Sequence, residues 1–158
     1  MGNNQLMMGI IRFLHDFFTV VWVGGLAFMV FTLAPSLSKV FGKDQKAQEV
    51  MQAVTRRHRV WTYISIIGIF VTGLLLGKSS PEYAGFMQFD NLYSSLASVK
   101  HLLIFAMIAI ALFRSISFGK KDRVVNPKQN KISFLLIAGN LLFGVVVLLL
   151  SALMAVLG

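Results

Sequence analysis

Two clusters of ionisable side chains in otherwise apolar stretches are the parts of this sequence best suited to chemistry. In the first apolar stretch, polar and aromatic residues recur at steps of three and four, namely Arg12, His15, Asp16, Thr19 and Trp22. This spacing places them on one face of a helix, with Arg12 and Asp16 spaced for an ion pair. Ionisable groups inside an apolar helix are costly to keep in a membrane, so they indicate a functional site.

The second cluster is the adjacent pair Lys100 and His101, at the start of another apolar stretch. Neighbouring residues point about 100° apart on a helix, so we expect one to face inward while Lys100 extends toward the surface. The third histidine, His58, stands among Arg56, Arg57 and Arg59. We expect His58 to belong to a solvated basic anchor on the opposite side of the membrane.

Two imidazoles from facing helices are a natural pair of ligands for a haem iron. We therefore predict a b-type haem held by His15 and His101, with Arg12 or Lys100 pairing with its propionates and Trp22 packing against the macrocycle. Copper is the alternative, because imidazole binds copper and thioethers assist with Cu(I); the candidates are Met7, Met8, Met87 and Met107. A non-catalytic membrane subunit or assembly factor is the third reading.

The segments that carry these side chains must be able to cross a bilayer. The chain has 158 residues, of which 56% are hydrophobic and 13% charged, and its mean hydropathy is +0.74. Because a helical span needs about 20 apolar residues, we predict an all-α integral membrane protein. Its single domain, 1–158, holds a bundle of four spans at about 6–37, 58–77, 92–118 and 132–157.

Local signals mark the ends of these spans. Pro35 is expected at the far end of the first span, and Asp90 or Asn91 as the N-cap of the third. The segment 44–59 has apolar residues at helical spacing, so it extends the second span inward or lies on the membrane surface.

The loops fix the orientation, because Lys and Arg are enriched in cytoplasmic loops. Twelve of the fifteen basic residues fall in the segments that join the first span to the second and the third to the fourth, or at the span ends next to these segments; the other three are Arg12, Lys78 and Lys100. We therefore predict a multi-pass protein of the inner (plasma) membrane with cytoplasmic basic loops and both termini on the non-cytoplasmic side.

Composition also excludes several functions. There is no cysteine, so disulfides, thiol catalysis and Cys-ligated metals are excluded. The net charge of +9 fits basic loops at an anionic leaflet, and no basic domain exists outside the membrane to bind nucleic acid. The first stretch lacks a basic start and a cleavage site, so we expect it to be retained rather than removed as a signal peptide.

The first span resembles the copper-resistance D (CopD) family and the related HemJ-type protoporphyrinogen oxidases. Leu14 and His15 are followed by Trp-Val-Gly-Gly-Leu at 22–26, and this is the most specific part of the resemblance. Further similar features cover most of the chain: the basic start of the second span, Thr-Gly-Leu at 72–74, Lys100, Arg114, and Asn-Leu-Leu-Phe-Gly at 140–144.

The resemblance implies copper movement across the membrane if the CopD side of the family applies, and b-type haem with an oxidoreductase activity if the HemJ side applies. In HemJ-like proteins a first-span His and a third-span Lys matter, and these correspond to His15 and Lys100. The chain lacks the Arg expected near Pro35 and an Asn-Glu pair in the fourth span, which argues against protoporphyrinogen oxidase activity. Expected partners are the lipid bilayer, a redox partner or quinone, and further copies of the chain or a larger complex.

Overall fold

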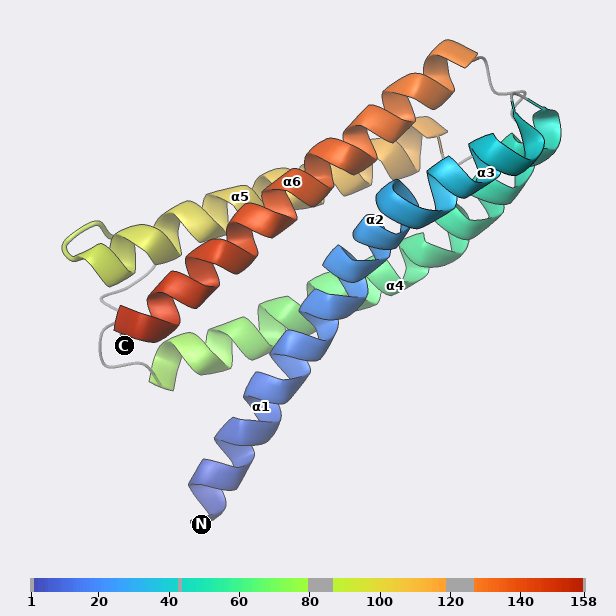
Figure 1. Cartoon of the computed structure of the whole chain (residues 1–158). Coiled ribbons are helices and arrows are strands. Elements are labelled where there is room, and N and C mark those ends of the chain that lie inside the picture. The colour runs from blue at the N-terminus through green and yellow to red at the C-terminus, as the bar shows by residue number, and fades with distance from the viewer. Residues whose placement is uncertain (1, 43, 80–86, 119–126, 158) are drawn as a thin grey trace.

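The computed structural model describes residues 2–42, 44–79, 87–118 and 127–157, and this part of the chain is helical with no strand. Four of its helices are long and apolar enough to cross a membrane. Both chain ends lie at the end of the bundle opposite the turn between α3 and α4 (Figure 1). The fold class predicted from hydropathy is confirmed to this extent.

The first span is one long helix, Asn3–Phe41, built of five segments. These are α1 (Asn3–Thr19), a π-helical segment η1 (Val20–Gly24), α2 (Gly25–Ala27), a second π-helical segment η2 (Phe28–Leu33) and α3 (Ala34–Phe41). Pro35 sits at the start of α3 and does not end the helix. Proline lacks an N–H and its ring crowds the preceding turn, which accounts for a widened π-helical turn just before it.

The other three spans are unbroken helices. They are α4 (Gln45–Ser79), α5 (Leu92–Phe118) and α6 (Pro127–Leu157). The segment 44–59 therefore forms, from Gln45 on, one continuous helix with the second span rather than lying apart from it. Asn91 caps α5, accepting a 2.7 Å hydrogen bond from the backbone N–H of Ser94. Pro127 opens α6 at a position where a missing N–H costs little.

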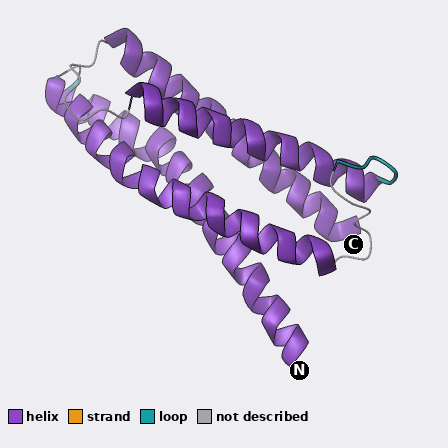
Figure 2. Cartoon of the chain, turned by 180° about the vertical axis from the view of Figure 1, so that it is seen from behind, coloured by secondary structure: helices purple, strands orange, loops and turns teal. Residues whose placement is uncertain are grey.

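The helices pack mainly as two pairs, α1 with α4 and α5 with α6. The second pair lies side by side along most of its length (Figure 1). The N-terminal part of α1 stands apart from the other helices, as the reverse view in Figure 2 also shows, and α1 has no buried residue. The core lies in the middle of the bundle, where the first span meets α5 and α6 through Trp22, Val23, Leu26, Met29, Met107, Ile137, Leu141 and Val147.

Large apolar side chains cover the outside of the bundle. Phe31, Ile116 and Val156 are 73%, 76% and 86% exposed. Monomeric soluble proteins rarely expose apolar patches on this scale, whereas lipid accommodates them at no cost. The surface therefore fits a bilayer as its solvent.

Candidate functional site

The imidazole of His15 is fixed by the neighbouring helix α4. Its Nδ1 lies 2.9 Å from the hydroxyl oxygen of Thr72. That hydroxyl has one hydrogen, and it donates to the backbone carbonyl of Gly68 at 2.6 Å. Thr72 must therefore accept from His15, so the proton of the neutral ring sits on Nδ1 and the Nε2 lone pair remains for another partner.

Glycine leaves room for this arrangement. The ring of His15 lies over Gly73, where an added Cβ would come 3.6 Å from its Cε1. One turn further along α1, the ring of Phe18 occupies the space that a side chain at Gly68 would need. The two glycines therefore let α1 approach α4 closely enough for the hydrogen bond between His15 and Thr72.

Lys100 on α5 belongs to the same neighbourhood. It is half-buried and interacts electrostatically with both His15 and Asp16 across the helices. His101 follows it on α5 and interacts with the backbone of Ala97, one turn earlier. The structure thus brings His15, Asp16 and Lys100 together, with His101 adjoining.

The depths of the two histidines can be compared through a shared contact on α6. A Cβ at Gly144 would lie 3.1 Å from both Cγ atoms of Val23 and 3.3 Å from Cε of Met107, so Val23 and Met107 mark one level. His15 precedes Val23 by eight residues, and His101 precedes Met107 by six. At about 1.5 Å per residue, these separations correspond to about 12 Å and about 9 Å along the respective helices, a difference of less than one helical turn.

Two other predicted site residues lie apart from this neighbourhood. Arg12 is exposed, one turn before His15 on α1. Trp22 is 2% exposed and packs in the core of the bundle. Its indole is thus used in helix packing, and its Nε1 has no hydrogen-bond partner within the described residues.

His58 is placed differently from the sequence expectation. It is half-buried, not part of a solvated anchor, and its ring occupies the space beside Gly25 where a Cβ would clash. The expectation was wrong because the flanking arginines suggested solvent on every side of the helix. The Trp-Val-Gly-Gly-Leu motif at 22–26 contained the missing signal, since a glycine in the middle of a span leaves space for a large neighbour.

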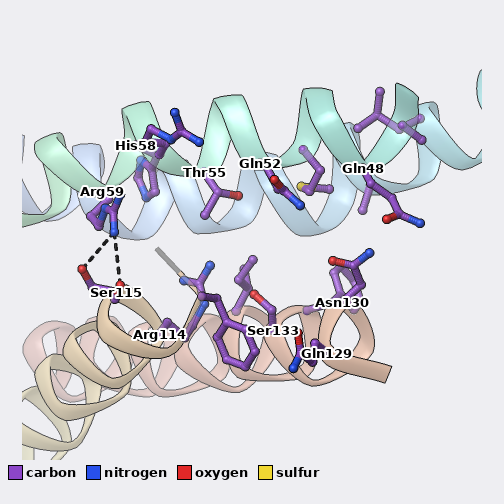
Figure 3. Close-up of a pocket in the computed structure, with 18 of the residues that line it drawn as sticks. Gln48, Gln52, Thr55, His58, Arg59, Arg114, Ser115, Gln129, Asn130 and Ser133 are labelled. Atoms are coloured by element: carbon purple, nitrogen blue, oxygen red, sulfur yellow. Dashed lines mark hydrogen bonds between the residues drawn. The ribbon is translucent and has the colours of Figure 1, made fainter. Parts of the chain in front are cut away.

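His58 borders a cavity of about 280 Å³ at the basic end of the bundle, which we call the basic cavity. Figure 3 shows His58 and Arg59 reaching toward it from α4 and Arg114 from the opposite side. Arg59 donates from Nη1 to the hydroxyl and backbone carbonyl of Ser115, at 3.0 and 3.3 Å. Sequence reasoning missed this cavity, because it treated these arginines as topology signals and as features of the family resemblance.

Polar groups without partners also occur deeper in the bundle. The side chains of Ser65 and Asn140 are buried, and neither forms a hydrogen bond with a described residue. Thr62 is equally buried but donates to the backbone carbonyl of His58. Most buried polar groups in proteins are bonded, so Ser65 and Asn140 mark positions where the isolated chain is incomplete in its hydrogen bonding.

Metal-ligand clusters of three or more His, Cys, Asp or Glu side chains do not occur within the described residues. The described residues therefore give no support for a metal-ion site built from those ligands alone. A haem needs only one or two protein ligands, which a pair of imidazoles supplies.

No protein-family model matches the sequence, and no solved structure matches it. The chain is similar to a protein of Aquifex aeolicus (strain VF5) that is described as uncharacterized. The two are 29% identical over 116 residues, which is 73% of each chain. This similarity carries no assignment of function.

Proposed function

We propose that the protein is a membrane redox protein of CopD-like type that binds a b-type haem in the half of the bundle nearer its termini. The observation that supports this most is the hydrogen bond of His15 to Thr72. Histidines that ligate metals usually donate their other ring N–H to a neighbouring acceptor, which fixes the tautomer and the ring orientation. His15 is held in this way, with Nε2 left as the ligating atom.

The surrounding residues fit the same group. His101 is the proposed second axial ligand, and its similar sequence distance from the shared level of Val23 and Met107 supports this choice. Lys100 carries a positive charge beside His15 and is suited to pair with a propionate, while Arg12 serves the same purpose nearer the surface. A haem bound there would supply one-electron transfer, and the chain would contribute the ligands and their orientation.

We further propose that the termini face the outside of an inner (plasma) membrane and the basic cavity faces the cytoplasm. Twelve of fifteen basic residues support this orientation. The haem would then lie toward the outer leaflet, where it can exchange electrons with a redox partner or a quinone.

The absorption spectrum of the protein purified after haem-replete expression tests the proposal. We expect a Soret band, with sharp α and β bands on reduction if two imidazoles ligate the iron. His15→Ala should abolish the Soret band. His58→Ala is the matched control, because it removes an imidazole at the other end of the bundle and should leave the spectrum unchanged.

A colourless wild-type protein would refute haem binding, and metal analysis of that sample would then show whether copper is bound instead. A haem that survives both His15→Ala and His101→Ala would refute the ligand assignment. Neither copper nor haem in the sample would favour a non-catalytic subunit or assembly factor.

A further inference from the structure

The residues that line the basic cavity have no role in the haem proposal. Its charged side chains, within the described residues, are three arginines, Arg56, Arg59 and Arg114, and the imidazole of His58 lines the same space. Neutral polar side chains, among them Gln48, Gln52 and Asn130, surround the same space (Figure 3). A cavity with several donors, several cations and no lining carboxylate is suited to an anion.

Two of these arginines, Arg59 and Arg114, have no counter-charge among the described lining residues. Arg59 and Arg114 are both half-buried and close enough to interact electrostatically with each other. Like charges held together away from water repel, and this repulsion is relieved when an anion binds between them. The cavity therefore gains stability from an anionic occupant.

Buried nitrogen atoms without a hydrogen-bond partner point to the same conclusion. Nε of Arg114 and Nε2 of His58 are buried, and neither has a hydrogen-bond partner within the described residues. Arg59 is held in place by its two bonds to Ser115. A guanidinium offers five N–H donors in a planar fork that matches the oxygens of phosphate, so Arg59 and Arg114 can both bind one phosphate group.

The rest of the lining is apolar. Leu37, Met51 and Ile137 face the cavity, and so does Phe134, which is also 37% exposed on the outside of α6. A ligand with an anionic headgroup and an apolar tail would match both the basic and the apolar parts of the lining. The volume of about 280 Å³ is close to the lower end of ligand pockets, roughly 300 Å³, which suits a headgroup rather than a whole lipid.

We propose that the basic cavity binds the phosphate group of an amphipathic phosphate ester, such as an anionic phospholipid, between Arg59 and Arg114. Its place at the basic end of the bundle suits a lipid of the anionic inner leaflet, because basic pockets between spans commonly bind acidic headgroups. Free inorganic phosphate shares the recognised chemistry and is the other source of such a ligand. This site is separate from the proposed haem site and does not depend on it.

Thermal unfolding of the full-length protein in neutral detergent, followed by far-UV circular dichroism, tests the proposal. The probes are dihexanoyl phosphatidic acid, inorganic phosphate and dihexanoyl phosphatidylcholine. We expect phosphatidic acid to raise the midpoint most, since a ligand that binds only the folded state stabilises it in proportion to its affinity. A rise with inorganic phosphate equal to that with phosphatidic acid would retain the site and identify free phosphate as its ligand.

Arg114→Gln and Arg59→Gln should each weaken phosphatidic acid binding about tenfold or more, because each removes charge-assisted hydrogen bonds. Arg57→Gln is the matched control: Arg57 is exposed on the same helix as Arg59 and does not line the cavity. Its binding curve should match the wild type. His15→Ala should also leave binding unchanged, which separates this site from the haem site.

Three outcomes would overturn the proposal. One is the absence of a midpoint rise with either phosphate compound. Another is an equal rise with phosphatidylcholine, which would indicate a general detergent or lipid effect. The last is an equal loss in Arg57→Gln and in the cavity variants. Native mass spectrometry of the wild type gives a reading that needs no variant, with one bound phosphatidic acid expected per chain.

Discussion

The hydrogen bond between His15 and Thr72 shows how one hydroxyl group can determine which ring nitrogen of a histidine keeps its lone pair. The Thr72 hydroxyl donates its hydrogen to the backbone carbonyl of Gly68, so toward His15 it can act only as an acceptor. The lone pair of the ring is thereby directed to Nε2. An isolated histidine on a helix has no such preference, since either nitrogen can carry the proton.

Thr72→Val removes this acceptor while nearly preserving the shape of the side chain. We expect the apo-protein to bind haem roughly 10- to 100-fold more weakly, the usual cost of losing an outer-shell partner of a ligating His. Spectroscopic titration with haem measures the change. Thr62→Val is the matched control, because Thr62 is buried on the same helix and bonds to the backbone of His58 instead. Equal weakening in both variants would contradict an outer-shell role for Thr72.

The sequence alone singles out some residues of the candidate site, and there is a physical reason why it does not single out the others. His15 and Lys100 stand out in any sequence of apolar spans, because an ionisable group there is costly. Thr72 belongs to the Thr-Gly-Leu motif at 72–74, but nothing in the sequence pairs it with His15, since threonines that bond to their own helix are common in membrane proteins. The burial of His58 depends on a glycine 33 residues away, and single-sequence spacing does not connect two helices.

At the scale of elements, close contact between the first span and α4 depends on glycines that receive large side chains. Gly25 accommodates His58, and Gly68 accommodates Phe18. The first span thus supplies Phe18 and Gly25 to this interface, and α4 supplies His58 and Gly68, so each side contributes one ring and one glycine. Hydropathy predicted four spans because length and apolarity suffice for that. It could not predict the π-helical segments η1 and η2, which arise from the local backbone around Trp22 and Pro35.

Gly68→Ala tests this packing. An added methyl group would overlap the Phe18 ring, so we expect a loss of about 1–3 kcal/mol in the free energy of unfolding, as overpacking usually costs. Gly24→Ala is the control, since its Cβ would meet only Val20 at 3.9 Å, and it should be neutral or slightly stabilising. Denaturant unfolding in detergent measures both. Adding Phe18→Leu should restore part of the loss; if it restores none, Phe18 is not the residue that Gly68 accommodates.

At the scale of the whole molecule, the two proposed sites lie at opposite ends of one bundle. The group of His15, Asp16, Lys100 and His101, which we call the histidine neighbourhood, lies on the N-terminal halves of the first span and of α5. The basic cavity is lined from the opposite end of the bundle, by residues of α3, the start of α4, the end of α5 and the start of α6. Apolar side chains cover the surface between them. One orientation in the membrane therefore assigns a leaflet to each site, and testing the orientation tests both assignments.

The absence of native cysteine makes that test direct. Gly2 and Asp44 are both exposed and lie before and after the first span, so a single cysteine at either position reports one side of the membrane. With basic loops cytoplasmic, we expect a membrane-impermeant maleimide to label Gly2→Cys in intact cells and Asp44→Cys only after lysis. Unlabelled wild-type protein is the background control. The reverse pattern would place the basic cavity outside, where the anionic inner leaflet could not supply its ligand, and the histidine neighbourhood inside, where an outer-leaflet redox partner could not reach it.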